Sequence, residues 1–298
     1  MVTLTAINGS QSTLDGRHAI REEHLNMATE IVQAVRLKDV AISFSIGERN
    51  QYDAVAETSL SIGEHEFVAI VGPTGCGKST LLNAAAGLLK PARGSVEVFG
   101  KPLSGINNDA GYLFQQDSLM PWKTVEENVA IGLEIKGVSK KEARTAAREW
   151  LARVGLSAFC ERYPMKLSGG QRKRVGLAQV LIRDPKLLLM DEPFGPLDAQ
   201  TRLLMGDLLL RLWSKDRKAV MFVTHDLDEA IALADRIVIM SAGPRSRMIG
   251  DYTVTLPRPR DIAEIRHDPA FIKLHREIWH ALRGEVMKAY GELAGEMR

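Results

Sequence analysis

Apolar residues along the chain follow two different periods, and the changes of period outline its elements. Apolar or alternating segments predict strands at residues 31–37, 40–46 and 55–62, and a fully apolar run at 67–71 predicts a buried strand. A helical pattern begins at Leu81. The first three segments are typical of an antiparallel β layer that precedes the rest of the fold.

The middle of the chain has a different character. After two short strand patterns at 94–100 and 111–114, residues 124–135 and 140–154 carry charges at helical spacing without a strand signal. These residues predict a helical subdomain, over about residues 116–180, inserted into an α/β body.

Strand and helix patterns then alternate in the last part of the body. In chain order they fall at residues 187–190, 199–214, 219–223, 227–234 and 236–240. Such alternation is typical of a parallel sheet with crossover helices. The predicted fold class is therefore α/β, with an antiparallel β subdomain ahead of the sheet and a helical subdomain inserted in it.

Both ends of the chain lie outside this alternating body. Residues 1–30 are polar and predict a flexible arm, and the Leu-Pro-Arg-Pro-Arg-Asp stretch at 256–261 predicts a linker. Beyond it, a spacing of three or four predicts an amphipathic helix with apolar residues at Phe271, Leu274, Ile278, Leu282, Val286, Tyr290 and Leu293. We therefore divide the chain into an arm (1–30), a main domain (31–255) and a C-terminal linker with helix (256–298).

Composition narrows the class of protein. The chain has 298 residues, of which 45% are hydrophobic and 26% charged, as in ordinary globular proteins. Its net charge of +2, from 39 basic and 37 acidic residues, gives no reason to expect nucleic acid as a partner. No apolar run is long enough to span a membrane, and the polar first 30 residues do not resemble a secretory signal. The two cysteines, Cys76 and Cys160, favour a reduced, cytosolic protein.

A glycine-rich segment stands between the apolar run and the first helix. It fits the phosphate-loop pattern at every fixed position and comprises Gly72, Pro73, Thr74, Gly75, Cys76, Gly77, Lys78, Ser79 and Thr80. Its glycines allow the backbone to wrap a phosphate, and its N–H groups and the helix N-terminus direct partial positive charge at the anion. Lys78 adds a full charge against the β- and γ-phosphates of ATP, and Ser79 offers a hydroxyl oxygen to Mg²⁺. The segment therefore predicts an ATP site with a magnesium ion.

A pair of acidic residues ends the apolar strand pattern at 187–190. Asp191 and Glu192 fall at the carboxyl end of this strand, which is the edge where ligands bind in parallel sheets. Asp191 is expected to orient the Mg²⁺ shell through water, and Glu192 to activate the attacking water as general base. Together with Lys78, the pair predicts nucleotide hydrolysis.

The segment Leu167-Ser168-Gly169-Gly170-Gln171 carries the most specific similarity to a known family. It matches the L-S-G-G-Q signature of the ATP-binding cassette (ABC) family without a substitution, and the chain resembles that family over about residues 31–255. The resemblance implies a P-loop NTPase with an ABC-type nucleotide-binding domain. It also implies that Ser168 and Gly170 bind the γ-phosphate held by an opposing subunit, so that two copies pair head to tail with ATP between them.

Three further residues match family motifs in the family's order. Gln115 resembles the glutamine that contacts Mg²⁺ and the attacking water, Asp198 the acid of the subunit-contact loop, and His225 the switch histidine that bonds the γ-phosphate. With these, the expected catalytic residues are Lys78, Gln115, Glu192 and His225, and the expected metal ligands are Ser79, Gln115 and Asp191.

The resemblance also implies an aromatic residue that stacks on adenine. Phe44 matches its place in the chain, and Tyr52 is an alternative. Because stacking needs only a π face, the sequence does not separate the two.

Four short segments resemble the ATPase subunits of nitrate, sulfonate and taurine importers. They are residues 119–122, 226–230, 233–236 and 256–260. This resemblance implies ATP-driven uptake of a small solute through a separate membrane permease, with a solute-binding protein outside the membrane. The chain would then act at the cytoplasmic face of the inner or plasma membrane as a peripheral subunit, and whether the paired ATPase subunits are identical stays open.

Other function classes are weighed against this one. In ABC proteins that act in DNA repair, a long coiled coil lies between phosphate loop and signature, and the 90 residues from Lys78 to Ser168 leave no room for it. Those that act on ribosomes usually carry two cassettes, and exporters often fuse ATPase and permease. A soluble ABC ATPase and the ATPase of an exporter stay as alternatives, whereas the intact set of motifs argues against a non-enzymatic regulator.

Overall fold

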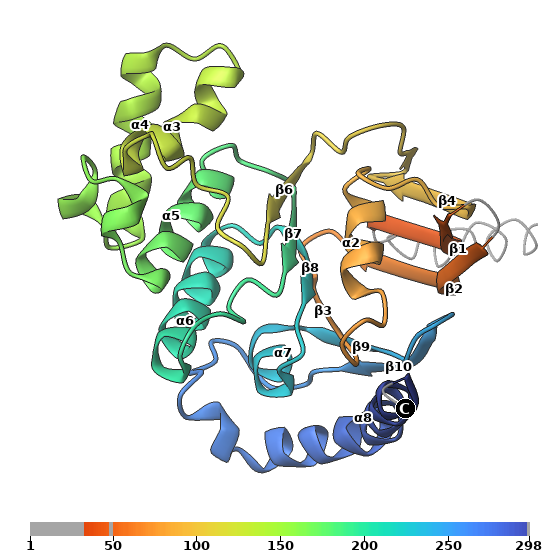
Figure 1. Ribbon diagram of the computed structural model, residues 1–298. Coiled ribbons are helices and arrows are strands. Elements are labelled where there is room, and N and C mark those ends of the chain that lie inside the picture. The colour runs from red at the N-terminus through yellow and green to blue at the C-terminus, as the bar shows by residue number, and fades with distance from the viewer. Residues whose placement is uncertain (1–32, 48–49, 297–298) are drawn as a thin grey trace, which may run out of the picture. The chain divides into compact units, whose positions relative to one another are not determined.

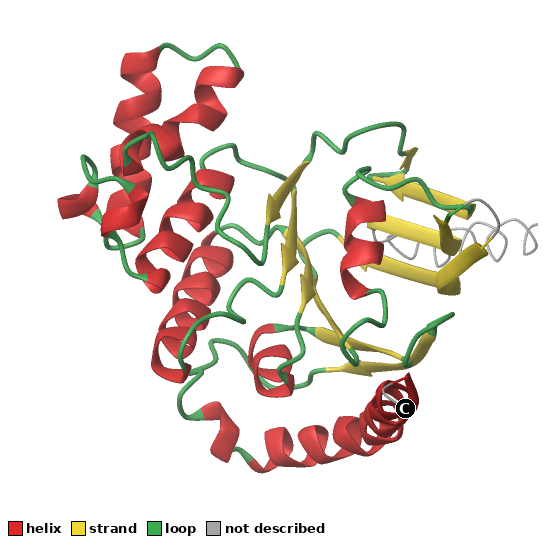
Figure 2. Ribbon diagram, in the orientation of Figure 1, coloured by secondary structure: helices red, strands yellow, loops and turns green. Residues whose placement is uncertain are grey.

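The computed structural model describes residues 33–47 and 50–296, which form two sheets flanked by helices (Figures 1 and 2). The arm expected at 1–30 lies outside the described residues. The domain boundaries expected from the sequence remain predictions.

A six-stranded sheet forms the centre of the α/β body (Figure 2). Its spatial order is β10-β9-β3-β8-β7-β6, and every neighbouring pair is parallel except β10 with β9. The strands are β3 (Phe67–Val71), β6 (Ala110–Leu113), β7 (Leu187–Asp191), β8 (Ala219–Val223), β9 (Arg236–Met240) and β10 (Met248–Thr253). The parallel sheet predicted from the alternating pattern is confirmed.

A four-stranded antiparallel sheet precedes it in the chain, in the order β2-β1-β4-β5. Its strands are β1 (Gln33–Ile46), β2 (Asn50–Gly63), β4 (Arg93–Val98) and β5 (Lys101–Pro102). The sequence predicts separate strands at 31–37 and 40–46, and this is wrong, because β1 runs through both. Its register against β2 shifts between Leu37 and Val40, where Asp39 has φ 49°. This bulge interrupts the alternation without ending the strand.

Helices cover the central sheet and form the inserted subdomain. The subdomain contains α3 (Val125–Ile135), α4 (Lys140–Arg153), α5 (Gly169–Leu181) and the 3₁₀ turns η1 (Ser157–Phe159) and η2 (Pro164–Lys166). The sheet is covered by α2 (Lys78–Ala85), α6 (Ala199–Lys215) and α7 (Leu227–Leu233). Capping boxes start α3 and α5, where Thr124 and Ser168 each exchange two hydrogen bonds with the residue three positions later.

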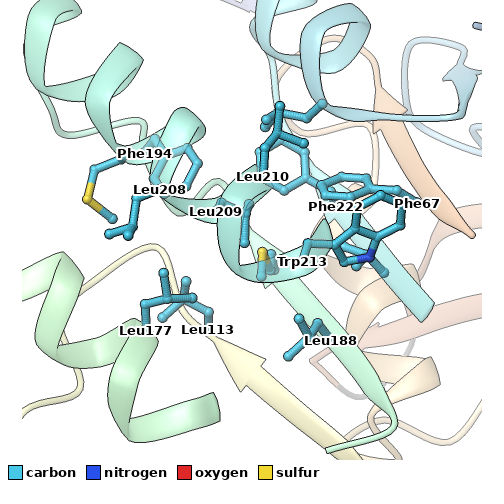
Figure 3. Close-up of a cluster of buried hydrophobic side chains, with 14 of the residues drawn as sticks. Phe67, Leu113, Leu177, Leu188, Phe194, Leu208, Leu209, Leu210, Trp213 and Phe222 are labelled. Atoms are coloured by element: carbon cyan, nitrogen blue, oxygen red, sulfur yellow. The ribbon is translucent and has the colours of Figure 1, made fainter. Parts of the chain in front are cut away.

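The central sheet is buried on both faces. Along β3, Phe67 and Val71 belong to one apolar cluster and Val68 and Ile70 to another, because successive side chains of a strand point to opposite sides. Figure 3 shows the first cluster, in which the rings of Phe67 and Trp213 meet edge to face at 5.7 Å. Burial of each large apolar side chain contributes roughly 1.5–3 kcal/mol, so the sheet is a rigid support for the loops at its ends.

The C-terminal part of the described chain packs on this body. Residues 256–261 form neither helix nor strand, yet the guanidinium of Arg260 is buried and donates to the carbonyls of Ile231, Ala232 and Ala234 at the end of α7. After η3 (Ile265–His267), α8 (Pro269–Glu296) follows.

The stripe predicted for the last helix is present as far as Val286, because Leu274 and Val286 pack partly buried against the core, and the Leu293 side chain lies outside the described residues. Phe271, Ile278 and Leu282 of α8 are buried, whereas Tyr290 is 67% exposed, so its predicted place on the apolar face is wrong. Among the residues that the structure describes, every helix is too short or too polar to cross a bilayer.

Four segments leave the central sheet at the same edge. In the parallel register Val223 lies beside both Ile70 and Asp191, and Leu113 lies beside Met190. The segments that follow β3, β6, β7 and β8 therefore come together at the carboxyl edge of the sheet, where such folds bind ligands.

Candidate functional site

The phosphate loop joins β3 to α2 and turns through two glycines with positive φ. Gly75 has φ 79°, and Gly77, the residue that caps the N-terminus of α2, has φ 90°. A Cβ on Gly77 would also lie 2.7 Å from Cγ2 of Val55. Glycine is therefore required at 77 by backbone conformation and by space.

Two side chains of this loop are buried. Lys78 is 4% exposed, and its ammonium group donates to the carbonyl oxygens of Gly72 (2.9 Å) and Pro73 (3.0 Å). Cys76 is also buried, and burial raises the pKa of its thiol, which keeps it neutral. The charge that the loop offers to an anion thus comes from Lys78, held within the loop by its own backbone.

The carboxylate of Asp191, at the end of β7, meets the loop directly. The Ser79 hydroxyl donates to Oδ1 of Asp191 at 2.7 Å. The Tyr112 hydroxyl donates to Oδ1 of Asn83 at 2.9 Å and lies 3.5 Å from Oδ2 of Asp191. Burial raises the pKa of the Asp191 carboxyl above its ordinary value, although the hydrogen bond from Ser79 opposes this shift. Hydroxyl and carboxylate oxygens are therefore gathered beside the loop.

Glu192 stands at the centre of the candidate catalytic residues. Its Oε1 lies 3.9 Å from Nζ of Lys78, and its Oε2 lies 3.0 Å from Nδ1 of His225 and 3.5 Å from Nε2 of Gln115. The backbone of Glu192 has φ 41° and its N–H donates to the carbonyl of Val223. The structure thus brings together all four residues that the sequence nominates for catalysis, from the ends of four neighbouring strands.

Two of the residues expected at a dimer interface cap helices of their own chain. The Ser168 hydroxyl caps α5 by accepting from the N–H of Gln171 (3.3 Å), and the Asp198 carboxylate caps α6 by accepting from the N–H of Thr201 (2.9 Å). Gly170 faces the same threonine, since a Cβ on it would lie 2.5 Å from Cγ2 of Thr201. In Figure 1, α5 and α6 lie on the other side of the six-stranded sheet from α2. The side-chain hydrogen bonds of Ser168 among the described residues are with Gln171, and none reaches the phosphate loop of its own chain.

Comparison with known proteins decides the family. The family model described as ABC transporter matches residues 55–195. An uncharacterised ABC transporter ATP-binding protein of Methanocaldococcus jannaschii is 44% identical over 240 residues, which cover 80% of this chain and 88% of the relative. The chain belongs to the ABC transporter family. The taurine import ATP-binding protein TauB of Pseudomonas aeruginosa is 43% identical over 248 residues, covering 82% of this chain and 94% of that protein.

Solved structures of ABC cassettes share the fold of this chain. The dimeric cassette MJ0796 in a post-hydrolysis state, bound to ADP and Pi, superposes with a TM-score of 0.66 at 33% identity, covering 75% of this chain and all of that one. The predicted family, the predicted fold class and the assignment as an ATP-binding ATPase are confirmed by these similarities. The roles of single residues remain predictions.

In this ABC ATPase the residues on either side of His225 belong to a partly buried polar network that the sequence did not reveal. The Thr224 hydroxyl donates to Oε2 of Glu229 at 2.8 Å. Arg202 of α6 forms an ion pair with Asp226 at 2.7 Å and also donates to the carbonyl of Leu197, just before Asp198. Burial raises the pKa of Glu229 to about 7. Arg202 thus links the subunit-contact loop to the residue after His225.

A second group that the sequence did not reveal holds the glutamine loop, which comprises residues 114–117 and carries Gln115. Lys173 of α5 is 4% exposed and donates to the carbonyls of Phe114 and Gln115. Asp117 accepts from Lys173 at 3.2 Å and from Arg172 at 2.7 Å. The signature helix is therefore attached to the loop that carries Gln115. Lys173 lies two positions after Gln171. Its place next to the signature could have indicated a role at the site, but Lys173 is not part of the motif.

The two aromatic candidates for adenine stacking share one surface. Phe44 and Tyr52 are directly paired across β1 and β2, so they lie on the same face of the sheet, and they are 40% and 37% exposed. The Tyr52 hydroxyl lies beside Gly243, which itself lies against Gly75 of the phosphate loop. Both side chains are thus available beside the loop, and the alternative stated from the sequence stays open.

Proposed function

We propose that this ABC ATPase powers the uptake of a small anion, of the taurine, sulfonate or nitrate type, through a separate permease. The relatives named as taurine import ATP-binding proteins support this, because the similarity to one of them extends over 94% of its length at 43% identity. The segments at 119–122 and 256–260, which resemble this importer group, support the same assignment.

The convergence of three polar side chains on Glu192 is the observation that carries the hydrolytic mechanism. Glu192 acts as general base and takes a proton from the attacking water, while Gln115 and His225 orient that water and the γ-phosphate. Lys78 places its positive charge where negative charge develops during phosphoryl transfer. Loss of the γ-phosphate removes the ligand that Gln115 and His225 share, which reopens the site.

A magnesium ion fits the oxygens gathered beside the phosphate loop. The Ser79 hydroxyl and the Asp191 carboxylate lie 2.7 Å apart, and the amide oxygen of Gln115 is a third candidate ligand. No group of three or more His, Cys, Asp or Glu in the described ranges could hold a metal, and Mg²⁺, which keeps waters and phosphate oxygens, needs no such group. When bound with ATP, the ion would neutralise charge on the β- and γ-phosphates.

Two copies of the chain form the complete enzyme, with each ATP between the phosphate loop of one and the signature of the other. The support is geometric, because α5, which Ser168 caps and which contains Gly170, lies across the central sheet from α2 in its own chain (Figure 1). Asp198, in the loop beside Gly170, contacts the opposing copy. The dimeric structures of MJ0796 are consistent with this pairing.

The permease docks on the helical subdomain, at the cytoplasmic face of the membrane. The Trp122 side chain is 72% exposed and that of Met165 is 78% exposed. The backbone hydrogen bond from Val125 N–H to the Arg162 carbonyl holds their segments side by side. Exposed large apolar side chains grouped in this way fit a protein partner, and Gln115 at the base of the subdomain links this surface to ATP. A solute-binding protein outside the membrane delivers the anion.

Replacing the general base separates binding from hydrolysis. Glu192→Gln keeps the shape of the side chain and removes the proton acceptor, so we expect the ATPase rate to fall by about 10²–10⁴-fold while ATP affinity stays close to that of the wild type. Rates from phosphate release and affinities from a fluorescent nucleotide titration check this. Normal turnover by the variant would show that another group is the base.

The importer assignment is tested by co-purifying the chain with the permease encoded beside its gene and measuring ATPase activity in vesicles. We expect the external binding protein loaded with taurine, a sulfonate or nitrate to stimulate hydrolysis, with the Glu192→Gln complex as the inactive control. Strong hydrolysis without permease association would favour a soluble ABC ATPase. Stimulation by a solute added on the cytoplasmic side alone would favour an exporter.

A further inference from the structure

The turn between β9 and β10 lies directly against the phosphate loop. A Cβ on Gly72 would approach the carbonyl oxygen of Met240 to 2.9 Å, and Gly243 lies beside Gly75 and Cys76. The buried hydroxyl of Ser246 donates to the carbonyl of Cys76. The loop that is expected to hold the phosphates is therefore supported from behind by residues more than 160 positions later in the chain.

The β9–β10 turn is itself bonded to the C-terminal helix α8. Oε2 of Glu285, on α8, accepts a hydrogen bond from the Ala242 N–H at 2.9 Å. Oε1 of the same carboxylate accepts from Lys288, and the Glu285 side chain is 14% exposed. The Lys288 ammonium holds the pKa of the Glu285 carboxyl below its ordinary value, so the group is ionised and forms a charge-assisted bond with the backbone.

The helix that carries Glu285 is packed firmly against the body of the protein. Its earlier half is anchored by Phe271, Ile278 and Leu282, which are buried against the body. In Figure 1 it passes α7 and reaches the strands β9 and β10. The turn has a second attachment, because the N–H of Ser246 donates to the carbonyl of Ala54 on β2 at 3.2 Å. Glu285 secures the end of the turn that β2 does not hold.

We propose that Glu285 is a positioning residue for nucleotide binding. By holding Ala242 it keeps the β9–β10 turn against Gly72, Gly75 and Cys76, and so keeps the phosphate loop in the conformation that receives the phosphates. The C-terminal helix thus contributes to ATP affinity from outside the motifs of the family. The inference rests on the role proposed above for the phosphate loop.

Calorimetric titration of full-length variants with ADP tests the inference. Glu285→Ala removes the acceptor of the Ala242 N–H. We expect the Kd for ADP to rise about 3- to 10-fold, because the loss of one charge-assisted hydrogen bond is transmitted only in part to the nucleotide site. Glu285→Gln keeps an acceptor oxygen at the same place and should recover most of the affinity. Lys288→Ala removes the ion pair alone and should bind ADP like the wild type.

The readout separates positioning from general stability. A merely structural Glu285 would lower the melting temperature of the Glu285→Ala variant and leave the Kd unchanged at temperatures well below it, and that result would overturn the proposal. Should Glu285→Ala fail to fold, Ser246→Ala tests the other contact of the turn, with the same rise in Kd expected and an unchanged Kd as the contrary result. Lys78→Ala in the same titration tests the phosphate-loop assignment itself. We expect this variant to lose ADP affinity, and a wild-type affinity would show that the assignment is wrong.

Discussion

Backbone conformation at single residues sets the geometry of the site. Gly75 and Gly77 adopt positive φ in the phosphate loop, and Glu192 does so without the freedom of a glycine, at φ 41°. A non-glycine residue in this region costs of order 1 kcal/mol or more, which the surrounding structure must supply. Here the N–H of Glu192 is bonded to Val223, so the strained residue is held at the end of a rigid parallel pair.

The two loop glycines should respond differently to alanine. A Cβ on Gly77 would meet both an unfavourable φ and the side chain of Val55 at 2.7 Å, whereas a Cβ on Gly75 would have nothing within 4 Å. We expect Gly77→Ala to lower the free energy of unfolding by about 2–4 kcal/mol, and Gly75→Ala by about 1–2 kcal/mol. Urea unfolding of the two variants measures this difference, and equal losses would mean that the contact with Val55 relaxes freely.

Glu229 should make stability depend on pH near neutrality. Burial raises the folded-state pKa of Glu229 to about 7, above the ordinary value of 4.5. Between these two pH values the folded chain therefore binds the proton more tightly than the unfolded chain does. The stabilisation from this group is complete below pH 4.5 and is lost as the pH rises through 7. Glu229→Gln cannot ionise and should escape this loss.

The difference in free energy of unfolding between Glu229→Gln and the wild type should therefore move in favour of the variant by about 2–3 kcal/mol from pH 5 to pH 8. Denaturant titrations at several pH values measure it. Glu277→Gln, on the exposed face of α8, is the matched control. A difference that does not change with pH would contradict the buried, protonated state of Glu229.

Site residues were predictable from the sequence where the chemistry is local. Short motifs contain Lys78, Ser79, Asp191 and Glu192, and the residues that flank these motifs predict a strand, a turn and a helix. Their supporting partners were not predictable in this way. Arg202 with Asp226, and Glu285 with Ala242, are pairs far apart in the chain, and no local pattern marks either member.

At the scale of elements, α5 joins the signature to the glutamine loop. Lys173 and Arg172 on this helix both pair with Asp117, and Lys173 also donates to the carbonyl of Gln115. A shift of the helical subdomain would therefore move the glutamine loop with it. In the proposed complex, movement of the permease would reach Gln115 through this attachment.

Asp117→Asn should weaken this attachment without touching the nucleotide. It leaves the buried ammonium of Lys173 without its carboxylate, so we expect a loss of about 1–3 kcal/mol in stability and a several-fold loss of permease-stimulated ATPase. ADP affinity should stay unchanged, as titration can check. Asp109→Asn, which breaks the exposed pair with Lys186, is the control. Full stimulation in Asp117→Asn would argue that coupling takes another route.

Elements were predicted best where burial is complete. The fully apolar strands β3 and β8 were predicted with the bounds that the structure has, because every position in them is buried. Strand β10 was missed because its side chains alternate between partly buried and exposed, so no position in it is fully buried. The bulge at Asp39 split β1 into two predicted strands, since a change of register looks like an end when only the pattern is read.

At the scale of the whole molecule, each chain carries two halves of different sites. Helix α2, which follows the phosphate loop, lies on one side of the central sheet, and α5, which begins at the signature, lies on the other, as Figure 1 shows. In the head-to-tail arrangement proposed above, neither half completes the other within one chain, so activity is expected to require two copies.

Mixing two inactive variants tests this arrangement. Lys78→Ala should disable every phosphate loop in its own dimer, and Ser168→Arg every signature. A mixed dimer keeps one intact pair, from the unchanged loop of one chain and the unchanged signature of the other, so part of the ATPase activity should return on mixing. Melting temperatures of the single variants control for unfolding, and absence of recovery in a verified mixed dimer would argue against the head-to-tail pairing.

The common edge at which β3, β6, β7 and β8 end has a practical consequence for labelling the protein. The turn from α6 into β8 is at the opposite edge, and Lys215, Asp216 and Arg217 in it are exposed. A fluorophore or peptide tag inserted there would sit a strand's length from the nucleotide. Such a reporter could follow assembly with the permease in living cells while the enzyme runs at its normal rate.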